Sequence, residues 1–128
     1  EQINSLGLVN GLSDYWGSAV SYLGPHYMKV SPITSRGEPN LWANNKYDYR
    51  INGSNKIINY NFVYTRDYDF ASSIIKSYGK PDLIYQLQPE ISEPELIMID
   101  QLKEASNNIL IYNKNSSGWQ KIQQLIAK

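Results

Sequence analysis

Apolar segments of two kinds alternate through the second half of the chain, and this alternation constrains the fold more than any other feature. Short apolar runs typical of buried strands lie at Ile57–Tyr64, Leu83–Leu87 and Ile109–Tyr112. A segment with the helical period of about 3.6 residues follows each run. These segments cover Phe70–Tyr78, Ser92–Ser106 and a final stretch that begins at Ser116 or Ser117. Strands that alternate with helices predict a layered α/β fold.

Capping residues mark the limits of the first and last of these helices. Asp67 or Asp69 precedes the first one and can accept hydrogen bonds from the free N–H groups of its first turn. Gly79 favours an end to that helix because glycine tolerates a positive φ. Ser116 or Ser117 can cap the last helix in the same way.

The clearest local signal lies between the second and third apolar runs. Ser92 and Glu95 have the spacing of a capping box, and Pro94 is tolerated in a first helical turn. The pattern predicts a helix that continues to about Ser106. Its buried face would consist of Met98, Ile99, Leu102 and Ala105.

The first half adds one strand and a loop. Tyr27–Ser31 has strand character, and Pro32 restricts this strand to a sheet edge or marks its end. A loop follows over Thr34–Asn45, with Leu41 and Trp42 as its apolar anchor. We therefore expect one domain over residues 1–128. Its mostly parallel or mixed central sheet would have about four strands, with Ile57–Tyr64 in a central position and helices at the flanks.

The stretch Gly11–Gly24 is the densest aromatic region near the N-terminus. Its spacing predicts an amphipathic helix from about Asp14 to Leu23, with Ser13 as the capping residue. Gly24 and the proline after it would end this helix. One face of the helix would carry Leu12, Tyr15, Trp16, Ala19 and Leu23.

Four residues in and beyond this stretch are candidates for ligand binding: Asp14, Tyr15, Trp16 and Trp42. Aromatic rings stack on the apolar faces of sugars, and a carboxylate accepts hydrogen bonds from sugar hydroxyls. Together these side chains could form a shelf for a carbohydrate. In the alternative interpretation, Trp16 fills the core and Asp14 only stabilises the start of the helix.

Composition excludes several classes of function. Twelve basic and twelve acidic residues give a formal net charge of zero, and the basic residues are scattered, so we expect no nucleic-acid partner. The chain has no cysteine and one histidine, which argues against thiolate chemistry and histidine-based metal sites. No glycine-rich phosphate loop follows a strand. We expect no cofactor and no metal site.

The sequence also offers no convincing catalytic set. His26 is the only imidazole, and no serine lies in the motif of a nucleophile elbow. Two carboxylate pairs, Asp67 with Asp69 and Glu93 with Glu95, fall where helix caps are expected. We predict no catalytic residue, and whether the protein has enzymatic activity stays open. The competing hypothesis is a hydrolase that uses Asp67 and Asp69 as acid and base.

The run Gly11–Trp16 (GLSDYW), a following helix of small residues and then Val30–Ile33 resemble part of a known enzyme family. The family comprises polytopic membrane glycosyltransferases of the protein-mannosyltransferase type, which use polyprenyl-phosphate sugars, and the resemblance is to their soluble C-terminal region. Later motifs occur in the same order over Gly11–Asn113: Ile58–Tyr64, Tyr78–Pro81, Leu83–Leu87 and Ile109–Tyr112. In this comparison Ser92–Ser106 is an insertion.

The resemblance implies an extracytoplasmic domain excised from a longer membrane protein, which agrees with a chain that starts at Glu1 and has no apolar stretch of roughly 20 residues. The family's catalytic carboxylates lie in its membrane part, so none is carried over. The expected role is to cover the active site or position the acceptor. The expected partners are the transmembrane part of the parent chain and a glycan or lipid-linked sugar. The alternative is a stand-alone soluble α/β module that binds carbohydrate or protein.

Overall fold

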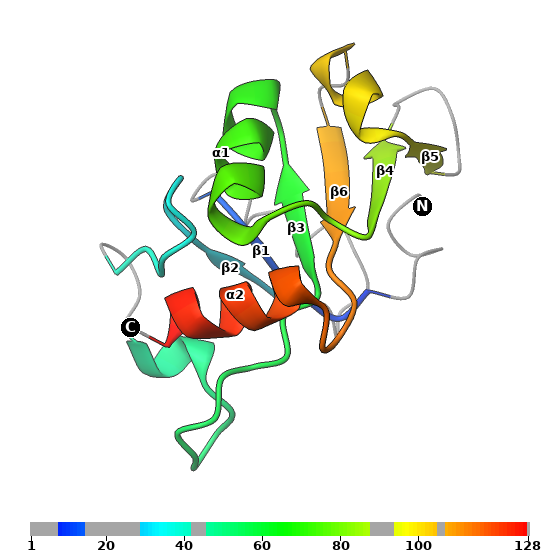
Figure 1. The fold of residues 1–128 in the computed structure, drawn as a ribbon. Coiled ribbons are helices and arrows are strands. Elements are labelled where there is room, and N and C mark those ends of the chain that lie inside the picture. The colour runs from blue at the N-terminus through cyan, green and yellow to red at the C-terminus, as the bar shows by residue number, and fades with distance from the viewer. Residues whose placement is uncertain (1–7, 15–28, 42–45, 88–93, 105–106, 128) are drawn as a thin grey trace.

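A computed structural model describes residues 8–14, 29–41, 46–87, 94–104 and 107–127. They form a six-stranded mixed sheet in the order β2-β1-β3-β6-β4-β5, with two α-helices (Figure 1). The strands are β1 (Asn10–Ser13), β2 (Lys29–Pro32), β3 (Phe62–Thr65), β4 (Leu83–Leu87), β5 (Glu95–Ile97) and β6 (Asn107–Ile111). The helices are α1 (Tyr68–Tyr78) and α2 (Ser117–Ile126), with short 3-10 helices η3 (Lys46–Tyr49) and η4 (Ile99–Glu104). The predicted α/β class is confirmed, but the sheet has more strands than the four expected.

The strand directions show why the sheet is mixed rather than mostly parallel. β1 pairs in parallel with both β2 and β3, whereas β6 is antiparallel to its neighbours β3 and β4. β3 and β4 therefore run in the same direction, are joined by α1 and have β6 inserted between them. The carboxyl ends of β1, β2, β3 and β4 all lie at one edge of the sheet, which is the upper edge in Figure 1.

The helix predicted over Ser92–Ser106 is wrong. Glu95–Ile97 is the edge strand β5, in which Ile97 lies opposite Ile84 and Glu95 opposite Gln86. Backbone pairing with β4 overrides the local capping signal, and only η4 is helical in the described part of this segment. Leu102 is buried as predicted, but Met98 is 70% exposed and Ile99 is 37% exposed. Ser92, Glu93, Ala105 and Ser106 lie outside the described residues.

The residues before Asp14 also differ from the prediction. Leu12 and Ser13 belong to β1, and Leu12 is fully buried. Ser13 was expected to cap a helix, but its hydroxyl donates to the carbonyl oxygen of Tyr64 at 2.7 Å and ties β1 to β3. The predicted helix over residues 15–23, and with it Tyr15 and Trp16, lies outside the described residues.

The strand predicted at Ile57–Tyr64 is shorter in the structure, where β3 begins only at Phe62. Its central position is confirmed, because β3 lies between β1 and β6 and both Phe62 and Val63 are fully buried. The edge position allowed for Pro32 is confirmed as well: Pro32 is the last residue of β2, an edge strand. Tyr27 and Met28 of the predicted strand lie outside the described residues.

The residues predicted to cap the helices after β3 and after β6 do cap α1 and α2. The carboxylate of Asp67 accepts a hydrogen bond from the backbone N–H of Phe70 at 2.8 Å and so caps α1. Gly79, with a φ of 95°, ends α1. The Ser116 hydroxyl accepts from the backbone N–H of Trp119 at 3.2 Å and caps α2. Local sequence therefore determines where both helices begin.

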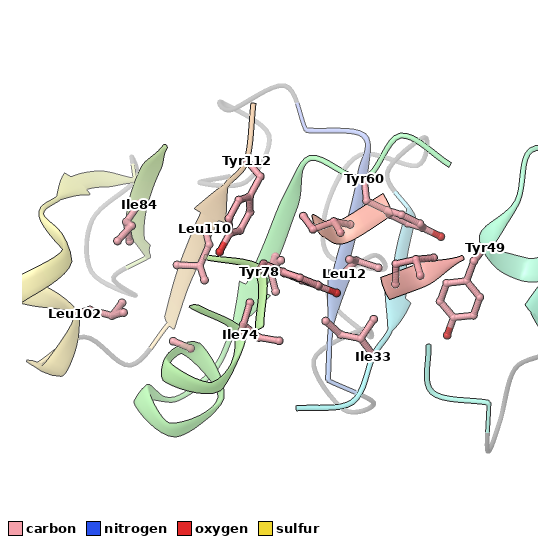
Figure 2. Close-up of a cluster of buried hydrophobic side chains, with 14 of the residues drawn as sticks. Leu12, Ile33, Tyr49, Tyr60, Ile74, Tyr78, Ile84, Leu102, Leu110 and Tyr112 are labelled. Carbon is pink, nitrogen blue, oxygen red and sulfur yellow. The ribbon is translucent and has the colours of Figure 1, made fainter. Parts of the chain in front are cut away.

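α1 and α2 pack on the same face of the sheet (Figure 1). Figure 2 shows the main core between them and the strands, a cluster that includes Ile74 of α1, Leu12 of β1 and Leu110 of β6. Successive strand residues point to opposite faces, so the neighbours of these side chains form a second, smaller cluster on the other face. That cluster consists of Leu8, Val30, Phe62, Ile109 and Ile111.

Buried tyrosines, rather than the predicted apolar anchor, hold the loop after β2. Leu41 is 53% exposed, so it does not anchor the loop, and Trp42 lies outside the described residues. Instead, the hydroxyl of Tyr78 donates to the carbonyl oxygen of Gly37 at 2.6 Å, and that of Tyr49 donates to the carbonyl oxygen of Pro32 at 2.5 Å. The core therefore uses phenol groups that satisfy backbone acceptors.

These tyrosines should ionise late in an alkaline titration. Burial raises the pKa of Tyr49 to about 12, and it also raises the pKa of Tyr60, Tyr78 and Tyr112. A pKa that is higher in the folded state means stability that is complete below pH 10 and is lost as the pH rises through the folded pKa. Absorbance at about 295 nm should therefore show exposed tyrosines near pH 10 and buried ones only later, together with unfolding. A single transition near pH 10 in the folded protein would contradict this burial.

Candidate functional site

The strand order produces a switch point at the carboxyl edge of the sheet. β1 and β3 are adjacent and parallel. The connection that leaves β1 leads to β2 on one side, whereas the connection that leaves β3 leads through α1 to β4 on the other. In open α/β sheets such a divergence leaves a crevice outside the strand ends, and ligands bind there. We take the residues that follow β1 and β3 as the candidate site.

An ion pair lies across this switch point. Asp14 directly follows β1 and Arg66 directly follows β3, and the distance between their Oδ2 and Nη2 atoms is 3.0 Å. The side chains are 24% and 42% exposed, respectively, so both are accessible to a ligand. The hydrogen bond that Arg66 donates to the carboxylate of Asp14 raises the pKa of Arg66, which keeps the guanidinium charged. An ion pair this exposed contributes about 0–1 kcal/mol to folding, so a role in stability alone accounts poorly for its position.

Buried polar groups support the strand ends beneath the ion pair. Three polar residues, Ser13, Thr65 and Asn108, are fully excluded from solvent and belong to the neighbouring strands β1, β3 and β6. The hydroxyl of Thr65 donates to the carbonyl oxygen of Asn108 at 3.4 Å, and that of Ser13 donates to Tyr64. Buried hydroxyls with fixed acceptors hold the three strand ends in register and so position Asp14 and Arg66.

Tyr64 lies on β3, two residues before Arg66, and its phenol interacts electrostatically with both members of the pair. It is half-buried, and its hydroxyl donates to Oδ1 of Asn107 at 3.3 Å. Burial raises the pKa of Tyr64, the positive charge of Arg66 lowers it, and the negative charge of Asp14 raises it. The phenol is therefore neutral at physiological pH and within electrostatic range of both members of the pair. The site combines an acceptor, a donor and an aromatic ring.

The structure places one of the four predicted binding residues at this site. Asp14 is there, whereas Tyr15, Trp16 and Trp42 lie outside the described residues. The carboxylate of Asp14 binds Arg66, an interaction that neither interpretation of the sequence included. The sequence analysis missed Arg66 and Tyr64, although Tyr64 ends the apolar run predicted as a central strand and Arg66 follows shortly after it, where site residues of α/β folds gather.

The carboxylates considered as an acid and base take structural positions. Asp67 is exposed and caps α1, and Asp69 is exposed in the first turn of the same helix. Glu95 lies in β5, not at a helix start, and Glu93 is outside the described residues. Within the described ranges, no three histidine, aspartate or glutamate side chains are grouped so that they could hold a metal ion. The described part of the chain also has no helix whose length and apolar character would let it span a membrane.

Comparisons with protein-family models, with curated proteins and with solved structures found no match for this chain. The candidate site is therefore defined by the chain's own geometry. Its chemistry suits a neutral polar ligand, because Asp14 already neutralises Arg66 and a carboxylate beside a guanidinium offers acceptors and donors together.

Proposed function

We propose that this chain is a non-catalytic, extracytoplasmic domain of a membrane glycosyltransferase that uses lipid-linked sugars. Its role is to position the acceptor at the active site or to cover that site, and its main partner is the transmembrane part of the same protein. The observation that carries the proposal is the position of Asp14, the acidic residue of the GLSDYW run, at the switch point of the sheet beside Arg66 and Tyr64.

The chemistry of this edge supports binding of a glycan. The carboxylate of Asp14 accepts hydrogen bonds from hydroxyl groups, and the guanidinium of Arg66 donates to hydroxyl oxygens. The ring of Tyr64 offers an apolar surface of the kind that sugars pack against. A domain that binds but does not transform a sugar needs no nucleophile or base, which suits the structural positions of Asp67 and Asp69.

The second candidate is a stand-alone soluble module that binds carbohydrate or protein. The observation that favours it is that Asp14, Arg66 and Tyr64 come together within this chain and need no membrane part to be positioned. The DNA that encodes the residues before Glu1 distinguishes the two candidates. Several apolar stretches of roughly 20 residues support the transferase domain, whereas a single cleavable signal or an immediate start codon leaves only the module.

A kinetic experiment on the full-length protein tests the positioning role. Replacing Arg66 with glutamine should raise the KM for acceptor about tenfold and leave kcat within about twofold, because the change removes a charge-assisted hydrogen bond that orients substrate. The matched control is Arg36→Gln, which changes an exposed arginine in the loop after β2. An equal effect of the two substitutions on KM, or a selective loss of kcat in Arg66→Gln, would refute the positioning role.

A further inference from the structure

A concave surface lies at the end of the sheet opposite the switch point. It is a depression of about 350 Å³ in the loop between η3 and β3, which is the loop at the bottom of Figure 1, away from the edge where β3 and β4 end. Its lining residues are Tyr47, Arg50, Ile51, Asn52, Gly53, Ser54 and Asn55. This volume is within the range of small-ligand sites, so the depression is large enough for a single sugar ring.

Local hydrogen bonds give this loop a defined shape. The backbone N–H of Ile51 donates to the carbonyl oxygen of Lys56 at 2.8 Å, which closes the turn. Gly53 has a φ of 74°, a conformation that favours glycine. The Ser54 hydroxyl donates to the carbonyl oxygen of Ile51 at 3.2 Å and accepts from the N–H of Lys56 at 3.0 Å. Ser54 therefore maintains the turn, and ligand recognition is left to the other lining residues.

Arg50 provides a fixed positive charge in the depression. Its guanidinium donates to the carbonyl oxygens of Lys46 at 2.6 Å and of Ala127 at 3.4 Å, so its orientation is set by η3 and the end of α2. A guanidinium has more N–H donors than these carbonyls use. Within the described residues Arg50 has no carboxylate within ion-pair distance, and no acidic residue lines the depression. The site therefore favours an anionic group.

The remaining lining residues suit a sugar ring. Tyr47 is 66% exposed and Ile51 is 50% exposed, so each presents apolar surface to solvent. The Lys46 ammonium lies 5.4 Å from the centre of the Tyr47 ring, but Lys46 itself does not line the depression. The exposed amides of Asn52 and Asn55 make no hydrogen bond to any described residue, so their donors and acceptors are available for hydroxyl groups.

We propose that this depression binds an acidic sugar, a single ring that carries a carboxylate or phosphate group. Arg50 binds the anionic group, the ring packs against Tyr47, and Asn52 and Asn55 bind the hydroxyls. This site is separate from the switch point, and its existence does not depend on the proposed transferase role. It differs from the switch point in charge, because there Asp14 neutralises the arginine.

The test is an NMR titration of the ¹⁵N-labelled chain with glucuronate, with glucose and inorganic phosphate as parallel titrants at equal ionic strength. Glucuronate should shift the amide signals of residues 47–55 in a saturable manner, at least about fivefold more tightly than either parallel titrant, because only glucuronate has both ring and charge. Phosphate that binds as tightly as glucuronate would overturn the proposal, because it would show a simple anion site. So would equal binding of glucose, or shifts confined to the surroundings of Asp14 and Arg66.

Two variants locate the interaction on specific side chains. Arg50→Gln should weaken glucuronate binding about tenfold. Since Arg50 also bridges η3 and α2, Tyr47→Ala is the second variant: its exposed ring can be removed without disturbing the core, and glucuronate binding should weaken about fivefold. Arg36→Gln and Tyr68→Ala are controls of matched type outside the depression and should leave binding unchanged. Unchanged binding in Tyr47→Ala, or equal losses in the controls, would refute the proposed site.

Discussion

Replacing Tyr112 with alanine should destabilise the protein by about 3–5 kcal/mol, which is a large part of the total stability of a domain this size. Tyr112 follows β6 and is fully buried (Figure 2). Its ring lies edge-on to that of Tyr78, with centroids 6.0 Å apart. A β-carbon on Gly118 would lie only 2.3 Å from the Tyr112 ring, which shows how closely α2 approaches it. Removal of the ring leaves a cavity between the sheet and both helices.

The hydroxyl of Tyr112 should contribute much less than its ring. It donates to the carbonyl oxygen of Gly79, the residue that ends α1, at 2.7 Å. Gly79 is exposed, so water can replace this donor, and Tyr112→Phe should cost about 1 kcal/mol. Urea unfolding followed by circular dichroism measures both variants, and Tyr68→Phe, on an exposed side chain, is the control. Equal losses for Tyr112→Phe and Tyr112→Ala would show that the hydroxyl, not ring packing, dominates.

The elements that were predictable from sequence are those with local causes. α1 and α2 each combine an apolar stripe with a side chain that caps the first turn, and both signals lie within a few residues. β3, β4 and β6 were predictable because continuous apolar runs match strands with neighbours on both sides. Their relative directions were not, because direction depends on what joins β4 to β6, and there a helix was predicted where the chain forms β5 and η4.

β1 and β5 were missed because pairing with other strands, rather than their own sequence pattern, specifies them. β1 contains Gly11 and Ser13, which have little intrinsic preference for strands, and it forms through pairing with β2 and β3. β5 has only three residues, and it is specified by its pairing with β4 rather than by its own pattern. Short strands of this kind carry too few residues for an alternating signal to stand out.

The same reason separates the predicted from the unpredicted parts of the candidate site. Asp14 was identified because it lies in a recognisable aromatic run. Its partner Arg66 is 52 positions away in sequence, and no local pattern links the two. Only the parallel pairing of β1 with β3 brings them together. A correct strand order would have identified Arg66, because it would have shown that both residues follow strands that diverge at a switch point.

Replacing Gly11 with valine should destabilise the protein by about 3 kcal/mol, although valine is the better residue for a strand. A β-carbon at Gly11 would lie 2.2 Å from Cζ of Phe62 and within 2.5 Å of both Cε atoms. Phe62 is fully buried in the second cluster, so its ring has no open space to move into. The steric cost exceeds the gain in strand preference, which is at most about 1 kcal/mol.

A compensating substitution separates this clash from any other role of Gly11. Phe62→Leu shortens the opposing side chain and alone should cost about 1 kcal/mol, but in the Gly11→Val background it should restore part of the lost stability. A double-mutant cycle by urea unfolding should therefore give a favourable coupling of at least about 1 kcal/mol. Additive effects would mean that the Phe62 ring is not what prevents a larger side chain at position 11. Because Gly11 lets β1 lie against β3, and those strands end in Asp14 and Arg66, the same contact that stabilises the sheet also positions the candidate site.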